Sequence, residues 1–339
     1  MAHNLSMKDG KAEMAYTGAT PWHSLGTRVD GLQTAQDMLR HAGLLWTVST
    51  RPVAFPVEEG GAPSKWARGV RVIVRDDTHA DLGVASARYQ PIQNTQAGEM
   101  MDALVTEGGA HVEVAGALGQ GERAWMLAHV PSDFDVVKGD RVSTYVLLAW
   151  GHDGKHGLAG KLTPVRVVCR NTLNMALGAK WSKTADVFIR HSGTVKLRIE
   201  EAQRALGLVR KQVQETSEAF RALAQRQLSA AEASGYFSAL FTAPAAVEQA
   251  KRTDAEQESV ERWIAQQEQL AQLYVNGVGA NLAPDTAWNA YNAVTEYVDH
   301  VYPVLQSGKL SATRQESALF GSYAGIKREA LQSALALVK

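Results

Sequence analysis

Arginine and lysine side chains gather in one stretch of the sequence. Arg166 and Arg170 have an even spacing, so on a β-strand both would leave the same face. Guanidinium groups stay charged and offer planar pairs of donors that suit phosphate. Asp186 is the only acid among the cations that follow, which are Lys180, Lys183, Arg190, Lys196 and Arg198. The stretch predicts an anion-binding surface. A solvated strand edge whose arginines pair with acids of the helices is the alternative.

Two aromatic residues accompany cations and suit the binding of unpaired bases. Tyr89 follows Arg88, and Trp181 follows Lys180. Bases of single-stranded nucleic acid stack on aromatic faces beside cationic side chains. Ordinary core or hairpin positions are the alternative for both aromatics. The sequence therefore predicts a nucleic-acid site made of Tyr89, Arg166, Arg170, Lys180, Trp181, Arg190, Lys196 and Arg198.

The element that positions the two arginines is expected to be a strand that runs directly into a helix. Val165, Val167 and Val168 give a β-branched alternation, and it stops at Asn171-Thr172. Asparagine and threonine are favoured N-caps, so a helix is expected to begin there. Its first backbone amides would add donors for a phosphate.

Other motifs give no support for catalysis. His152, Asp153 and His156 lie in one turn, but no third or fourth metal ligand has a characteristic spacing, so a polar hairpin is favoured. The glycine-rich segment 116–121 lies between two predicted strands and precedes no helix, which excludes a dinucleotide loop. Cys169, within Val-Val-Cys, fits a small core residue. We therefore expect no enzyme activity, no metal and no cofactor, and a metal-dependent enzyme using His152, Asp153 and His156 is the weakest hypothesis.

The composition is that of an ordinary globular protein. The 339 residues are 45% hydrophobic and 21% charged, and the formal net charge is zero. Nucleic-acid binding must therefore come from a local patch. A single cysteine excludes an internal disulfide and fits a reducing compartment. The first residues lack a secretory signal, and no apolar run reaches the roughly 20 residues of a membrane helix. The sequence predicts a cytoplasmic protein that does not interact with membranes.

The apolar pattern predicts an α+β fold: an antiparallel β-sheet flanked by helices, followed by a mainly helical C-terminal half. Helices are expected at 32–45 and 95–107, and strands at 46–56, 69–75, 82–89, 111–118, 122–130 and 142–150. From Glu200 the pattern changes to long helices, two of them preceded by capping boxes at Ser229/Glu232 and Thr253/Glu256. We expect an α+β domain at 1–199 and a helical region at 200–339. Packing of that region on the sheet as one unit is the alternative.

Several segments resemble the phage/plasmid-like protein family, a group of unknown function carried by phages, prophages and plasmids. The most specific is Pro164 to Leu173, with the sequence PVRVVCRNTL. The others are Trp22–Gly26, Tyr89–Asn94, Gly116–Trp125, Ile189–His191 and Thr286–His300. The setting of that family in mobile elements implies DNA handling rather than metabolism.

A second resemblance concerns organisation alone. The order helix, antiparallel strands, helix between Thr95 and Leu177 is similar to the core of phage single-strand annealing proteins of the Redβ, Erf and RecT types, and no motif residue carries over. The resulting hypothesis is an oligomeric, non-enzymatic protein that binds single-stranded nucleic acid and promotes annealing in recombination. The alternative is an anti-defence or regulatory factor that binds a host protein.

Overall fold

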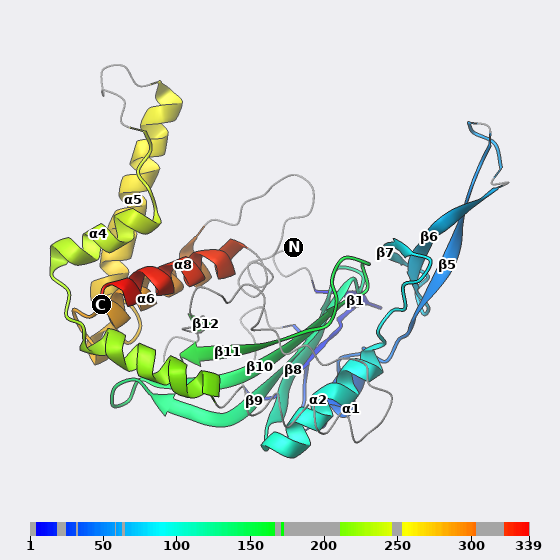
Figure 1. Ribbon diagram of the computed structural model, residues 1–339, viewed down its shortest axis with the longest axis horizontal. Helices are drawn as coiled ribbons and strands as arrows, with labels where there is room; N and C mark the ends of the chain where they lie inside the picture. Colours follow the sequence, from blue (N-terminus) through cyan, green and yellow to red (C-terminus); the bar gives the residue numbers. More distant parts are fainter. Residues whose placement is uncertain are drawn as a thin grey trace.

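The computed structural model describes residues 5–18, 25–31, 33–57, 59–62, 65–166, 171–172, 211–245, 253–302 and 322–338. The molecule is elongated, with a curved central sheet, a helical group at one end and a projecting β-hairpin at the other (Figure 1). The expected α+β class, with antiparallel sheets, flanking helices and a helical C-terminal half, is confirmed.

The central sheet has seven strands in the order β12-β11-β10-β9-β8-β3-β4. Only the β3–β4 pair is parallel. The β8–β9 pair is the hairpin expected from the sequence, with its turn at residues 119–122. The bounds are β3 Met14–Tyr16, β4 Thr27–Arg28, β8 His111–Leu118, β9 Arg123–Asp135, β10 Arg141–Gly151, β11 Ala159–Arg166 and β12 Asn171–Thr172.

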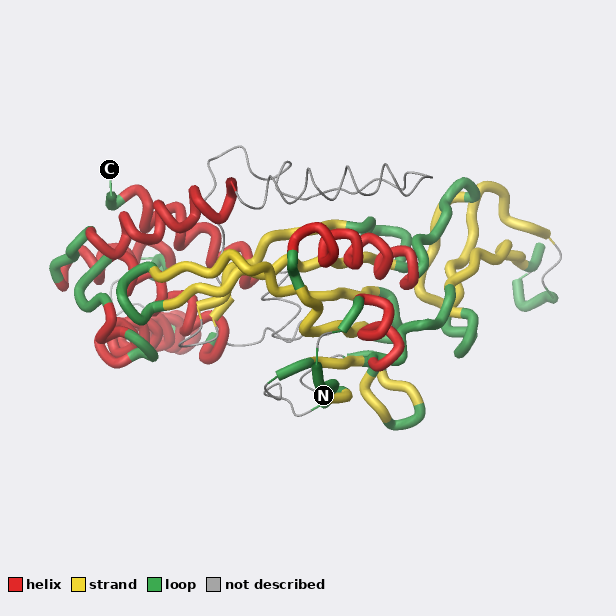
Figure 2. The backbone as a smooth tube through the Cα atoms, turned by 90° about the horizontal axis from the view of Figure 1, so that it is seen from below, coloured by secondary structure: helices red, strands yellow, loops and turns green. Residues whose placement is uncertain are grey.

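Two helices cover one face of this sheet (Figure 2). They are α1, Ala35–His41, and α2, Asn94–Gly108. Thr34 caps α1 through its side chain, and Gly109 ends α2 in the left-handed conformation that glycine adopts without strain. Apolar side chains of both helices, including Met38, Leu39 and Met101, are fully buried against the sheet. This apolar layer fixes which face of each strand points away from the helices.

The projecting hairpin belongs to a separate three-stranded sheet. It is formed by β5, Val48–Phe55, and β6, Lys65–Arg75, with β7, Asp81–Ser86, paired to β6. β6 starts at Lys65, before the predicted position 69. Gly69, with φ of 77°, lies in an irregular segment, and β6 pairs with β5 on both sides of it, at Trp66 and at Arg71. A small hairpin of β1, Met7–Lys8, and β2, Lys11–Ala12, lies near the central sheet (Figure 1).

The helical group contains residues 211–225 and several further helices. Both predicted capping boxes are confirmed: Ser229/Glu232 starts α4 and Thr253/Glu256 starts α5. In the described part of the chain, no helix combines the length and apolar character needed to cross a membrane. The bounds are α4 Ala230–Leu240, α5 Asp254–Asn276, η2 Ala280–Leu282, α6 Ala287–Glu296, the π-helix η3 Tyr297–Val301 and α8 Ser322–Ala336.

The helical group packs against the end of the β9–β10 hairpin. Trp288 of α6 donates from Nε1 to Oδ2 of Asp140 at 2.8 Å, and both side chains are buried. The ring of Phe134 contacts that of Phe220, with centroids 6.2 Å apart. The predicted boundary at 199/200 lies outside the described residues.

One predicted helix start is wrong. Asn171 and Thr172 form β12 and pair with Arg166 and Val165 of β11, so they extend the sheet. A polar pair after a β-branched run suits either a cap or a returning strand, and nonlocal pairing decides between them. α6 begins after Thr286, whose hydroxyl caps it by accepting a hydrogen bond from the Asn289 backbone.

Candidate functional site

The β5–β6 hairpin, residues 48–75, carries large apolar side chains that remain exposed. We call it the arm. Trp66 is 67% exposed and Phe55 is 46% exposed. Trp66 pairs with Ala54 and Phe55 pairs with Lys65, so the two aromatic rings leave opposite faces of the ribbon. A tryptophan this exposed is unusual, since tryptophan is buried in most proteins. Each face of the arm therefore offers one aromatic surface.

Cations lie beside these rings. Lys65 and Arg68 are exposed, and neither forms an ion pair with any acid among the described residues. Arg51 of β5 lies 4.0 Å from Asp76, at the outer limit of an ion pair. The arm thus combines exposed aromatic and cationic side chains, although the sequence analysis did not select it. The adjacent residues Lys65, Trp66 and Arg68 were the signal that could have found it.

The base of the arm is fixed by a buried ion-pair network around Arg75. Its guanidinium lies 2.5 Å from Glu13 and 2.7 Å from Asp77, and it stacks over the ring of Trp46 at 4.3 Å. Burial alone would lower the pKa of Arg75, but the hydrogen bonds and charges of Glu13 and Asp77 raise it. Burial would raise the pKa of Asp77, yet Arg75 and Lys8 hold it at about 2. Arg75 and Asp77 are therefore charged at neutral pH.

Of the predicted nucleic-acid site, two residues fall in the described part of the chain. Tyr89 is half-buried and packs against the main core, where burial and then the charge of Asp153 raise its pKa. Arg166 ends β11, with its backbone paired to Val142 and Asn171, and its side chain is not described. Arg170, Lys180, Trp181, Arg190, Lys196 and Arg198 lie outside the described residues. Their predicted role stays a prediction.

The turn with His152, Asp153 and His156 does not gather three metal ligands. His152 is buried, its Nε2 lies 2.9 Å from Oδ1 of Asn94, and its ring meets Trp46 edge-on. Burial lowers the pKa of His152 to about 4. The charge of Asp153 opposes this shift, and the charge of Arg75, the smallest of the three effects, adds to it. His156 instead pairs with Asp153 at 2.6 Å. The favoured interpretation of a polar turn agrees with this geometry.

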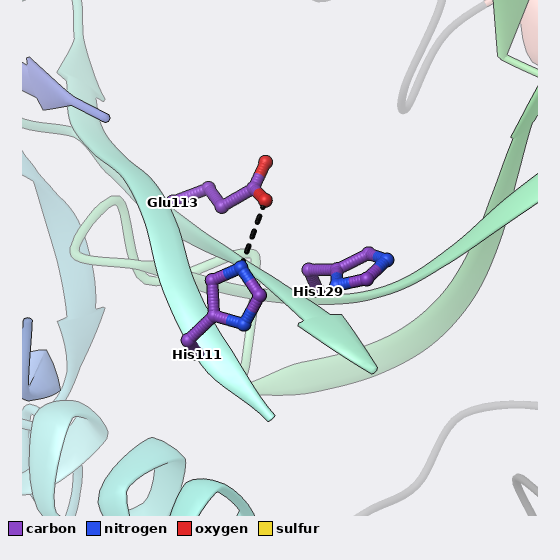
Figure 3. A group of neighbouring side chains, drawn as sticks. All are labelled: His111, Glu113 and His129. Atoms are coloured by element: carbon purple, nitrogen blue, oxygen red, sulfur yellow. Dashed lines mark hydrogen bonds and ion pairs between the residues drawn. The ribbon is translucent and has the colours of Figure 1, made fainter. Parts of the chain in front are cut away.

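A different histidine cluster lies on the face of the central sheet opposite α1 and α2. His111 of β8 and His129 of β9 are directly paired, and their ring centroids are 5.0 Å apart. Glu113 turns toward the same place, with Oε1 3.0 Å from Nε2 of His111 (Figure 3). The three side chains are partly exposed, at 33%, 28% and 18% for His111, Glu113 and His129. We call these three residues the histidine cluster.

The histidine cluster was not predicted from the sequence because it depends on strand pairing. A histidine-x-glutamate pair on one predicted strand and a histidine on the next were the available signal. Only the pairing of β8 with β9 brings His129 opposite His111. Within the described residues, this is the group of three whose possible ligand atoms all lie within 4.8 Å of one another.

The comparison with family models shows which protein family the chain belongs to. A domain of unknown function, DUF932, matches residues 81–320. The chain belongs to the DUF932 family. The match spans β7 to the region before α8, so it includes the histidine cluster and the packing of the helical group on the sheet, while the arm precedes it. Neither the curated proteins nor the solved structures yield a match, and nothing links the chain to phage annealing proteins.

Proposed function

We propose that this DUF932 protein binds single-stranded nucleic acid and that the arm provides one contact surface. The observation that carries the proposal is Trp66, 67% exposed, between Lys65 and Arg68 on a ribbon that projects from the body of the protein (Figure 1). Bases stack on exposed aromatic rings whatever their sequence, while neighbouring cations bind the phosphates.

Charge supports the same proposal. The chain has no net charge, so attraction of a polyanion must come from local groups. Lys65 and Arg68 can contact phosphate without first breaking an ion pair to a described acid. The predicted cationic stretch from Arg166 to Arg198 is the proposed second contact. Two separate contacts would hold one nucleic-acid strand extended, and an extended strand is suited to annealing by an oligomer.

The proposal does not require catalysis. Aromatic and cationic side chains at a ribbon bind a strand without any acid–base or nucleophilic group at the contact. The resemblance to phage/plasmid-like proteins supports a role in handling the DNA of a mobile element. A role in annealing during recombination is proposed from the order of the predicted elements alone. We propose a non-enzymatic binding protein that acts in the cytoplasm.

The test measures binding of a labelled single-stranded oligonucleotide by fluorescence anisotropy, with sizing of the free and bound protein. We expect Trp66→Ala to weaken binding about 5- to 150-fold, which corresponds to about 1–3 kcal/mol for a stacked base. Trp66→Phe keeps an aromatic face and should retain most of the affinity. The fold should be unchanged because the side chain is exposed. Equal affinity of Trp66→Ala and the wild type would exclude the arm as the contact.

A protein partner is the second candidate function, because exposed apolar side chains continue along this sheet. Val57 is 60% exposed and Val84 of β7 is 61% exposed. Exposed apolar clusters often mark protein contacts. The discriminating test is a pull-down after nuclease treatment with wild type and a Trp66→Ala/Val84→Ser variant. A host protein that is retained by the wild type alone would favour this function.

A further inference from the structure

We propose that the histidine cluster binds a divalent transition-metal ion through His111, Glu113 and His129. The proposal goes beyond nucleic-acid binding and does not depend on it. It rests on how the sheet places five polar side chains from three adjacent strands.

The register of the central sheet brings three rings together. His111 pairs with His129 across β8 and β9, and His129 pairs with Tyr145 across β9 and β10. Paired residues of an antiparallel sheet point to the same face, so the three rings form one row. The ring centroids of His129 and Tyr145 are 5.2 Å apart, at a T-shaped angle. The row lies on the face that α1 and α2 leave open.

A β-bulge in β8 adds the carboxylate. Val112 pairs with Ala128 and Val114 pairs with Leu127, so Glu113 is an extra residue in the strand. An extra residue re-aims its side chain, and bulges of this kind often lie next to functional sites. Glu113 reaches His111 at 3.0 Å and accepts a hydrogen bond from the Tyr145 hydroxyl at 3.1 Å. Glu113 is also two residues after His111, the spacing at which strand residues share a face.

An irregularity in β9 adds a second acid behind His129. Between the pairs Val130–Thr144 and Phe134–Val142, three residues of β9 oppose one residue of β10, and Asp133 is among them. Its Oδ1 lies 2.9 Å from Nε2 of His129. Asp133 also accepts hydrogen bonds from the Thr144 backbone and from the side chains of Arg141 and Ser143, and these bonds hold it in place.

The position of Asp133 decides which nitrogen of His129 can face a metal. Nε2 of His129 lies 2.9 Å from Oδ1 of Asp133, so Nδ1 is the nitrogen that remains for an ion. In Figure 3 one ring nitrogen of His129 lies on the side of His111 and Glu113, and the other points away from them. Histidines that bind metals commonly donate their second N–H to a carboxylate in this way.

The distances suit one ion after small side-chain rotations. Two ligands bonded at about 2.1 Å to the same ion are about 3.0–3.4 Å apart. Nε2 of His111 and Oε1 of Glu113, at 3.0 Å, already meet this separation, and an ion bound by both would replace the proton that these two atoms share, which passes to solvent. All three ligand atoms lie within 4.8 Å of one another, so His129 needs to move closer. The partial exposure of the three side chains leaves a path for the ion.

The donor set determines the class of metal. Two imidazoles and one carboxylate suit Zn²⁺, Fe²⁺, Co²⁺ or Ni²⁺, whereas Mg²⁺ and Ca²⁺ prefer oxygen ligands alone. Three protein ligands leave at least one position for water or a small ligand. Tyr145 and Asp133 are positioning residues, because they hold Glu113 and His129 and do not belong to the three ligands.

The test uses the full chain freed of metal by a chelator and then titrated with Zn²⁺, read by calorimetry. Co²⁺ is the second probe, read by its visible absorption. We expect one ion per chain, and loss of this binding in His111→Ala and His129→Ala. Asp133→Asn and Tyr145→Phe should weaken Zn²⁺ binding about 10- to 100-fold, since the partners that orient the ligands are removed. The matched control is His156→Ala, which removes another histidine paired with an aspartate and should leave binding unchanged.

Folding must be separated from metal binding. Glu113→Gln keeps the size of the side chain and its acceptor for Tyr145, and circular dichroism verifies the fold of each variant. Loss of Zn²⁺ binding in a folded Glu113→Gln protein supports the site even where an alanine variant unfolds. Stoichiometric binding that persists in the His111→Ala/His129→Ala variant, or no binding by the wild type, would overturn the proposal. The oligonucleotide assay reports separately on the proposed function.

Discussion

Nη2 of Arg75 lies 2.5 Å from Oε1 of Glu13, and the two side chains are only 2% and 4% exposed. Arg75 ends β6, and Glu13 lies between the small N-terminal hairpin and β3. The pair therefore joins the base of the arm to the central sheet. A second hydrogen bond, 2.6 Å from Nη1 to Oε2, makes it bidentate.

Removal of Glu13 should destabilise the protein strongly. Glu13→Ala leaves the guanidinium of Arg75 buried with Asp77 as its remaining acidic partner, and loss of one partner of a buried pair costs about 3 kcal/mol or more. Unfolding in urea measures the loss. Asp30→Ala is the control, since Asp30 is 92% exposed in its pair with Arg28, and it should change the free energy of unfolding by less than about 1 kcal/mol. Equal effects of the two variants would contradict the prediction.

Replacement of two cations of the arm should reduce the salt dependence of oligonucleotide binding. For a single strand, each phosphate contact adds about 0.7 to the slope of log affinity against log salt, so Lys65→Ala/Arg68→Ala should lower its magnitude by about 1.4. Anisotropy titrations at several salt concentrations give the slope. Arg40→Ala/Lys211→Ala removes two exposed cations elsewhere and should keep the wild-type slope. An unchanged slope in the arm variant would refute phosphate contacts there.

His152 should make stability depend on pH in mild acid. Its pKa is lowered from 6.5 to about 4 in the folded protein. The unfolded chain therefore binds more protons between these values, and the stabilisation, on the order of 3 kcal/mol, is complete above pH 6.5 and is lost as the pH falls toward 4. Urea unfolding at several pH values measures this. His152→Gln should flatten the dependence in that window, whereas exposed His41→Gln should retain it.

The hydrogen bond from Trp288 to Asp140 should hold the helical group on the sheet. Trp288→Phe removes the indole N–H from a buried carboxylate at 2.8 Å and leaves a cavity. A lost bond of this kind and the cavity together cost about 2–4 kcal/mol. The midpoint of urea unfolding should fall. Trp66→Phe, the same change at an exposed position, should leave the midpoint in place, and a fall of equal size there would contradict this explanation.

The sequence predicted elements whose signals are local. The capping boxes at Ser229 and Thr253 act within one helical turn, so a short window contains the whole interaction. The β8–β9 hairpin was predicted for the same reason, since its turn residues are adjacent in the chain. Asn171-Thr172 was misinterpreted because its pairing partners on β11 decide its conformation.

The candidate sites depend on nonlocal geometry, which explains why the sequence analysis missed them. The arm is conspicuous only once Trp66 is known to be exposed, and exposure depends on what packs around a strand. His111 and His129 meet because β8 and β9 pair in one register, and that register could not be read from the sequence, although Glu113 shares the face of His111 by its spacing. Hydrophobic periodicity predicts strands, but it does not show which strands pair or where a bulge occurs.

The bulge at Glu113 has a consequence for other members of the DUF932 family. A relative with one residue fewer in this strand could keep both histidines, the same sheet and the same core, yet have no carboxylate beside them. Strand length, rather than identity at the two histidine positions, would then separate the members able to hold a transition metal from those that cannot. The insertion of one residue in this strand would distinguish the metal-binding members from the others.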